Sequence, residues 1–127
     1  HFALIDKRRY APNQAEVSHL IGDLENMDVL IIDDMIDTAG TTVNAAEAAL
    51  AQGAKSVTAI ATHGVLSGPA IKRLHESKIK KIIVTDTINI PKEKQIAKME
   101  IVSVAEVFAE AVSRIHNGES VSALFQF

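Results

Sequence analysis

The chain has 127 residues, of which 47% are hydrophobic and 23% charged, a composition typical of one globular domain. Its net charge of −3 argues against nucleic-acid binding, and the lack of cysteine excludes disulfides and thiolate metal sites. Because no apolar run reaches the ~20 residues of a membrane span and no signal peptide is visible, we expect no membrane partner and a cytoplasmic protein.

The first residues predict a strand and then a loop. Residues 2–6, FALID, form a short apolar run that fits a buried strand. The chain opens in this strand without a methionine, so we expect a piece of a longer chain. Residues 7–14, KRRYAPNQ, are polar and basic and contain Pro12, which predicts an exposed loop. Residues 15–24, AEVSHLIGDL, fit either a returning strand or a short helix.

Strands and helices then alternate. The pattern predicts a strand at 29–32 buried on both faces, a helix at 41–52 ended by Gly53, a strand at 57–62, a helix at 67–77 with Pro69 in its first turn, and a strand at 82–85. This alternation indicates an α/β fold with a mainly parallel sheet and flanking helices. No internal boundary is visible, so residues 1–127 are expected to form a single domain.

The last helix has the clearest signals. Ser103 and Glu106 match a capping box, S-x-x-E, and Gly118 is placed to end the helix. Between them, apolar residues recur at helical spacing and give the helix one apolar face: Val104, Val107, Phe108, Ala111, Val112 and Ile115.

The stretch DVLIIDDMIDTAGTT, residues 28–42, carries the strongest functional pattern. It runs from the carboxyl end of a strand into a helix, where ligands bind in open α/β sheets. Thr38, Ala39, Gly40 and Thr41 open the helix, where unpaired backbone N–H groups and the helix dipole favour a phosphate. Gly40 would allow close approach of the backbone.

The aspartates of this stretch need a different partner, because carboxylates repel phosphate. Asp33 and Asp34 can accept hydrogen bonds from vicinal sugar hydroxyls, or they can attract a divalent metal. A phosphate seat beside sugar-binding carboxylates predicts a sugar phosphate such as ribose 5-phosphate. For both side chains to face one ligand, the strand must end at them. A magnesium site like that of receiver domains and simple helix capping stay open as alternatives.

Four stretches of the chain resemble known proteins. VLIIDDMIDTAGTT resembles the phosphoribosyl pyrophosphate loop of type I phosphoribosyltransferase folds. FALIDKRR, ATHGVLSGPA and NGESVSALF resemble the ribose-phosphate pyrophosphokinases. The similarity extends over essentially all 127 residues and matches only the carboxyl-terminal part of the family chain. It implies a type I phosphoribosyltransferase-like fold that lacks its first strand and the amino-terminal domain, with its ATP pocket and metal-binding histidine.

The resemblance also implies an activity and roles for named residues. The family transfers the pyrophosphoryl group of ATP to the 1-hydroxyl of ribose 5-phosphate with Mg²⁺, giving phosphoribosyl pyrophosphate and AMP. By this likeness Asp33 and Asp34 hold the ribose hydroxyls, and Lys7 and Arg9 act as catalytic residues on a lid. The 5-phosphate would be held by the loop made of Asp37, Thr38, Ala39, Gly40 and Thr41. No metal ligand is expected among these 127 residues.

The family likeness further implies a homo-oligomer regulated by phosphate and ADP at a subunit interface. Ser120, Ser122 and Phe125 match the carboxyl-terminal part of that regulatory site. They fit equally a surface tail in which Leu124 and Phe125 dock on the core or a neighbour. The family often has a proline where this chain has Tyr10, which implies at most a changed loop conformation.

Two other functions stay open. A type I phosphoribosyltransferase uses the same loop to transfer ribose 5-phosphate to a base, and it would not need the basic lid. A non-catalytic regulatory homologue should have lost lid or loop residues, whereas those of this chain are intact. His63 follows the strand expected at 57–62 and could face the site, but we expect it and His19, His75 and His116 to be structural.

Overall fold

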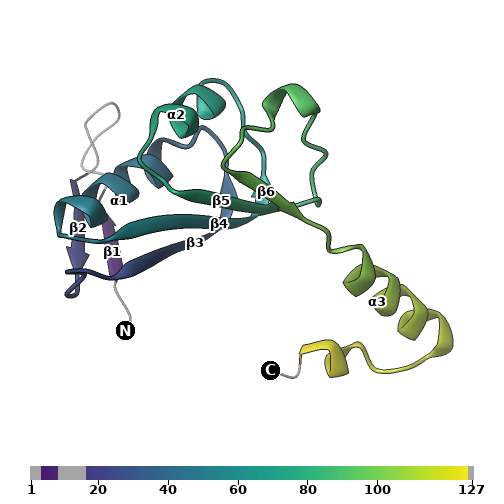
Figure 1. The fold of residues 1–127 in the computed structure, drawn as a ribbon. Helices are drawn as coiled ribbons and strands as arrows, with labels where there is room; N and C mark the ends of the chain where they lie inside the picture. Colours follow the sequence, from purple (N-terminus) through teal and green to yellow (C-terminus); the bar gives the residue numbers. More distant parts are fainter. Residues whose placement is uncertain (1–3, 9–16, 126–127) are drawn as a thin grey trace.

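The structure is a computed structural model that describes residues 4–8 and 17–125. Two short strands, β1 (Leu4–Arg8) and β2 (Val17–Ile21), form an antiparallel pair. Four more form a parallel sheet in the order β3-β4-β5-β6 (Figure 1): β3 (Asp28–Ile36), β4 (Ser56–Gly64), β5 (Lys81–Thr85) and β6 (Met99–Val102). The helices are α1 (Gly40–Ala51), α2 (Ala70–Glu76) and α3 (Ala105–Asn117), with 3₁₀ turns at Lys92–Lys94 and Val121–Phe125.

This architecture confirms the predicted α/β fold with a parallel sheet. Residues 17–21, whose state the sequence left undecided, form strand β2, paired with β1 from Leu4↔Ile21 to Arg8↔Val17. The strand β6 was not predicted, because its four residues include Glu100 and follow a lysine-rich segment. The predicted loop at 7–14 begins too early, since β1 continues to Arg8. Its other residues lie outside the described part of the chain.

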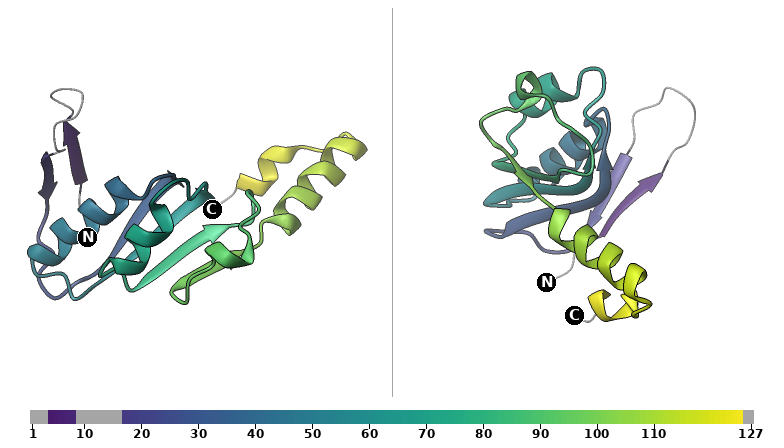
Figure 2. Two further views of the ribbon diagram at one scale, coloured as in Figure 1. Left: turned by 90° about the horizontal axis from the view of Figure 1, so that it is seen from above. Right: turned by 90° about the vertical axis from the view of Figure 1, so that its right-hand side faces the viewer.

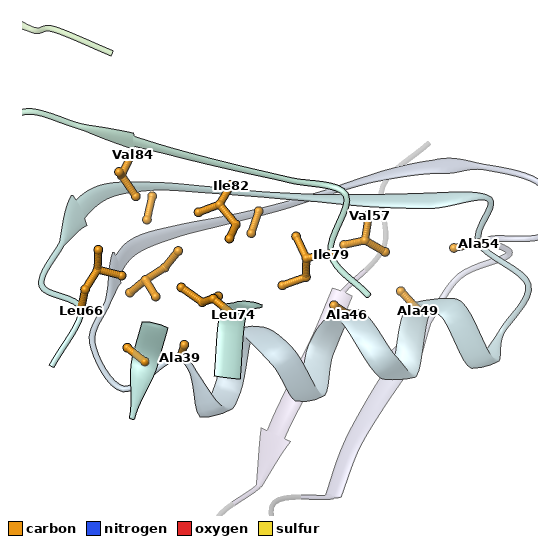
Figure 3. Close-up of a cluster of buried hydrophobic side chains, with 14 of the residues drawn as sticks. Ala39, Ala46, Ala49, Ala54, Val57, Leu66, Leu74, Ile79, Ile82 and Val84 are labelled. Atoms are coloured by element: carbon orange, nitrogen blue, oxygen red, sulfur yellow. The ribbon is translucent and has the colours of Figure 1, made fainter. Parts of the chain in front are cut away.

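The hydrophobic core lies between the sheet and the two helices α1 and α2 (Figure 3). Val57, Ile82 and Val84 point from the strands towards the helices and are fully buried. The helix α1 meets them with small side chains, among them Ala46 and Ala49, so its backbone lies close to the sheet. From α2, Leu74 is fully buried, which is worth about 1.5–3 kcal/mol of transfer free energy.

The opposite face of the sheet is not packed, which corrects the prediction for β3. The sequence indicated a strand buried on both faces, but Leu30 is 61% and Ile32 is 74% exposed. The reason is that α1 and α2 both lie on one face, as Figure 2 shows, and no described element covers the other. An unbroken apolar run therefore identified the strand correctly and its surroundings wrongly.

Helix α3 leads away from the sheet (Figures 1 and 2). Its apolar face is exposed to solvent. Val107, Phe108, Val112 and Ile115 are 60–67% exposed. Gly118 ends the helix with φ of 70°, as predicted.

The predicted capping box of α3 is replaced by a related contact, because the helix begins one residue later, at Ala105, and the Ser103 hydroxyl accepts the N–H of Ala105 at 3.2 Å. The Asp86 carboxylate, which follows β5, also accepts the N–H of Val104 at 2.9 Å. The Ser103 hydroxyl and this N–H lower the pKa of Asp86 below its ordinary 3.8. The start of α3 is thus tied to the sheet by Asp86.

Candidate functional site

A polar hollow of about 260 Å³ lies where β3 runs into α1. It holds three carboxylates and three threonine hydroxyls on one short stretch of chain. The lining residues are Asp33, Asp34, Met35, Asp37, Thr38, Ala39, Gly40, Thr41 and Thr42. The structure therefore brings together all seven residues that the sequence assigned to ribose 5-phosphate. A hollow of this size suits a small polar molecule rather than a large apolar one.

The amino terminus of α1 is open towards this hollow. The first hydrogen bond of the helix runs from the N–H of Val43 to the carbonyl of Ala39, at 3.0 Å. The N–H groups of Gly40, Thr41 and Thr42 precede this bond and so have no carbonyl partner within the helix. No side chain caps this end and no acidic residue occupies its first turn. Such an end binds an anion readily.

The turn into α1 has its unusual backbone at Ala39 and not at Gly40. Ala39 adopts φ of 60° and ψ of 4°, the left-handed region that costs a residue with a Cβ about 1–2 kcal/mol. It is also 4% exposed and belongs to the core. A left-handed residue before a helix is one way to gather backbone N–H groups into an anion-binding concavity. The sequence reading had assigned the special backbone role to Gly40 alone.

The two adjacent aspartates lie within β3, which corrects the expectation that the strand ends at them. The strand continues to Ile36, yet Asp33 and Asp34 both line the hollow. The Asp33 carboxylate turns along the backbone and accepts the N–H of Asp34 at 3.0 Å. A side chain bent in this way can share a ligand with its neighbour although the strand alternates.

The third aspartate of the hollow is held by the segment that follows β4. The hydroxyl of Ser67 donates a hydrogen bond to the Asp37 carboxylate. The backbone N–H of Ser67 also reaches the Asp37 carbonyl at 3.1 Å, and that of Leu66 reaches the Ile36 carbonyl at 3.0 Å. Sequence reasoning missed Ser67, although it lies in ATHGVLSGPA, one of the motifs that carried the resemblance.

A cationic side chain, that of Arg73, also contacts the loop. Arg73 of α2 donates a hydrogen bond from Nη1 to the carbonyl of Thr38 at 3.0 Å. The same nitrogen would lie 3.2 Å from a Cβ on Gly40, so the missing side chain of Gly40 makes room for the guanidinium. Sequence reasoning missed Arg73, and its only signal was a basic residue on the helix that follows β4.

His63 lies inside β4 rather than after it. Its Nδ1 lies 2.8 Å from the hydroxyl of Thr87, which donates in turn to the carbonyl of Thr62 at 3.0 Å. Thr85 donates to the same carbonyl at 2.7 Å. These contacts tie the ends of β4 and β5 together, in keeping with the structural role expected for His63.

Of the two predicted lid residues, only Lys7 has a described backbone. It falls in β1, which pairs with β2, and β2 contacts α1, whereas the hollow is at the amino terminus of that helix. Arg9 lies outside the described residues. The catalytic role of Lys7 and Arg9 stays a prediction.

The predicted regulatory residues follow α3. Ser120 accepts a hydrogen bond from Arg114 at its carbonyl, at 3.3 Å, and its hydroxyl accepts the N–H of Ser122 at 3.2 Å. Phe125 is 68% exposed. This turn packs on α3, and its regulatory role stays a prediction.

Neither a metal cluster nor a membrane helix occurs in the described part of the chain. Over residues 4–8 and 17–125, no three acidic or histidine side chains gather as candidate metal ligands. Within the same ranges, no helix combines the length and the apolar composition needed to cross a bilayer.

Comparison with known proteins shows the family to which the chain belongs. The family model described as "Phosphoribosyl synthetase-associated domain" matches residues 8–126. The chain is 58% identical over 123 residues to a ribose-phosphate pyrophosphokinase of Caldanaerobacter subterraneus, and 50% identical over 123 residues to that of Bacillus subtilis. Each match covers 97% of this chain and 39% of the relative.

A solved structure agrees with the sequence matches. The phosphoribosylpyrophosphate synthetase from Mycobacterium smegmatis superposes with a TM-score of 0.82 at 34% identity, over 91% of this chain and 37% of the other. The chain thus spans well under half the length of the proteins it matches. By the match over residues 8–126, the chain belongs to the phosphoribosyl synthetase-associated domain family.

Proposed function

We propose that this chain supplies the ribose-5-phosphate site of a ribose-phosphate pyrophosphokinase. The observation that carries the proposal is the uncapped amino terminus of α1, which opens into the same hollow as three carboxylates. A phosphate and a polyol are the two groups that such a hollow suits. The names of the relatives support the same substrate and product.

In the proposed arrangement each part of the loop binds a different part of the substrate. The 5-phosphate lies against the N–H groups of Gly40, Thr41 and Thr42, where the helix dipole stabilises its charge. The carboxylates of Asp33 and Asp34 accept hydrogen bonds from the ribose hydroxyls, each charge-assisted and worth about 1.5–3 kcal/mol. Together they fix the sugar so that its 1-hydroxyl projects towards ATP. Catalysis of phosphoryl transfer depends mostly on such positioning.

Lys7 and Arg9 are proposed to close over the transferring phosphates. Their positive charge would stabilise the negative charge that builds up there, and closure would exclude water that could hydrolyse ATP. Mg²⁺ is proposed for the whole protein. The described residues do not gather a ligand set for it, and no role assigned to them depends on it.

The remaining features of the proposal concern the assembled protein. We infer a cytoplasmic homo-oligomer in which Ser120, Ser122 and Phe125 respond to phosphate or ADP. The exposed Phe125 and the exposed apolar face of α3 are compatible with burial in such an assembly. ATP is expected to bind mostly on parts of the protein other than this chain.

The test is AMP release by the full-length protein that carries these residues. With ATP present, the proposal predicts AMP formation only when ribose 5-phosphate is added, in equal amount to phosphoribosyl pyrophosphate. A phosphoribosyltransferase would instead release pyrophosphate from phosphoribosyl pyrophosphate when given a base. A non-catalytic homologue would do neither, and either of these results would overturn the proposal.

A further inference from the structure

We propose that Ser67 and Arg73 are positioning residues that hold the loop Asp37–Gly40 in its ribose-5-phosphate-binding shape. The proposal rests on the proposed function and adds to it two residues on a different part of the chain. Neither residue lines the hollow in the described structure, so both act through the loop they contact.

Ser67 fixes the loop at Asp37. Its hydroxyl donates to the Asp37 carboxylate, and its backbone N–H donates to the carbonyl of the same residue at 3.1 Å. The carboxylate is thereby held in one direction at the rim of the hollow. Without this partner it could turn towards the phosphate seat, where two negative charges would repel each other.

Arg73 fixes the loop one residue further on. Its guanidinium donates to the carbonyl of Thr38 at 3.0 Å and occupies the space left free by Gly40. The contact also brings a positive charge near a hollow lined by three carboxylates. Arg73 therefore offsets part of the negative potential that a phosphate would meet there.

The two contacts are anchored in the core and are not loose surface bonds. Leu66, beside Ser67, is 1% exposed and its carbonyl accepts the Nζ of Lys94 at 3.1 Å. Ala70 and Leu74, on the helix that carries Arg73, are fully buried. The supporting segment is thus anchored in the core, and it holds Asp37 and Thr38 just before Ala39. The left-handed backbone of Ala39 is one that alanine does not favour.

The consequence is a loop that is already ordered before the substrate arrives. Preorganisation of this kind strengthens binding of substrate and transition state alike. Ser67→Ala and Arg73→Gln should therefore each raise Kd and KM for ribose 5-phosphate about tenfold, the loss typical of one charge-assisted hydrogen bond. The kcat at saturating sugar and the KM for ATP should change less than twofold.

The experiment is calorimetry of ribose 5-phosphate binding and steady-state kinetics on the full-length protein. Arg73→Lys should recover part of the affinity, because it keeps the charge and loses the planar donor geometry. Lys72→Gln, which removes the neighbouring exposed charge of α2, is the matched control and should bind as the wild type does. Melting temperatures within about 2 °C of wild type would show that the variants fold.

Each outcome separates this proposal from the proposed function. Weak binding by Ser67→Ala and Arg73→Gln, with Lys72→Gln unchanged, supports the positioning role. Equal affinity in wild type and variants, or a fall in kcat with KM unchanged, overturns that role alone. An equal loss in Lys72→Gln would also overturn it, because bulk charge would then explain the effect. A wild type that does not bind ribose 5-phosphate overturns the proposed function itself.

Discussion

The carbonyl of Ala39 accepts the first hydrogen bond of α1, from the N–H of Val43 at 3.0 Å, while Ala39 itself holds a left-handed backbone. The three N–H groups between these residues precede the first helical bond. Strained backbone of this kind clusters at active sites and ligand-binding turns. The geometry at Ala39 therefore leads to a prediction about stability and binding.

Ala39→Gly should keep ribose 5-phosphate affinity within threefold and should not destabilise the protein, because glycine adopts positive φ without strain. Ala39→Val should cost about 1–3 kcal/mol of stability, since a β-branched residue is strained at this φ and would overpack a buried position. Thermal unfolding and calorimetry of both variants provide the measurement. A stable, fully binding Val variant would show that the left-handed turn is not required.

Lys7→Ala should lower kcat about 10²–10³-fold and change KM for ribose 5-phosphate only a few-fold, if Lys7 stabilises the transferring phosphates. Steady-state AMP release measures both constants, with Lys78→Ala as an exposed lysine control. A variant that keeps its kcat and loses only sugar affinity would show that this segment binds substrate and does not assist the chemistry.

Asp86 should titrate below the ordinary 3.8, because the Ser103 hydroxyl and the Val104 N–H stabilise its carboxylate. A lowered folded-state pKa means that the contribution to stability is present above the unfolded value of 3.8 and is lost as pH falls through the folded value. Ser103→Ala should move the pKa of Asp86 back towards 3.8. Carboxyl NMR titration of the two forms would detect the shift, and an unchanged value in Ser103→Ala would contradict the contact.

Residues 1–127 expressed alone should self-associate and should not make AMP. Leu30 and Ile32 on the sheet and Phe108 and Ile115 on α3 expose apolar side chains that need cover. Light scattering measures the association, and Ile32→Lys with Ile115→Lys should reduce it. A monodisperse wild-type monomer that turns over ATP and ribose 5-phosphate would contradict both expectations.

Apart from β2 and β6, the sequence predicted the strands, the helices and the substrate loop, because these depend on local patterns. Such signals involve only residues that are close in the chain: examples are the apolar run at 29–32 and the glycines that end helices, Gly53 and Gly118. The exposure of Ile32 and the tie from Asp86 to Val104 were not predictable, since they depend on which elements pack together. Ser67 and Arg73 were missed for the same reason: each lies about 30 residues or more from the loop residue it contacts.

Calorimetry of ribose 5-phosphate binding to full-length wild type, Asp33→Ala and Gly40→Val tests the central claim most directly. Asp33→Ala removes a charged acceptor from the sugar hydroxyls, and we predict a loss of about 1.5–3 kcal/mol, or roughly ten- to a hundred-fold in affinity. Gly40→Val should lose at least as much, because it would obstruct the phosphate seat and displace Arg73. Unchanged affinity in both variants would contradict the assignment of this hollow to ribose 5-phosphate.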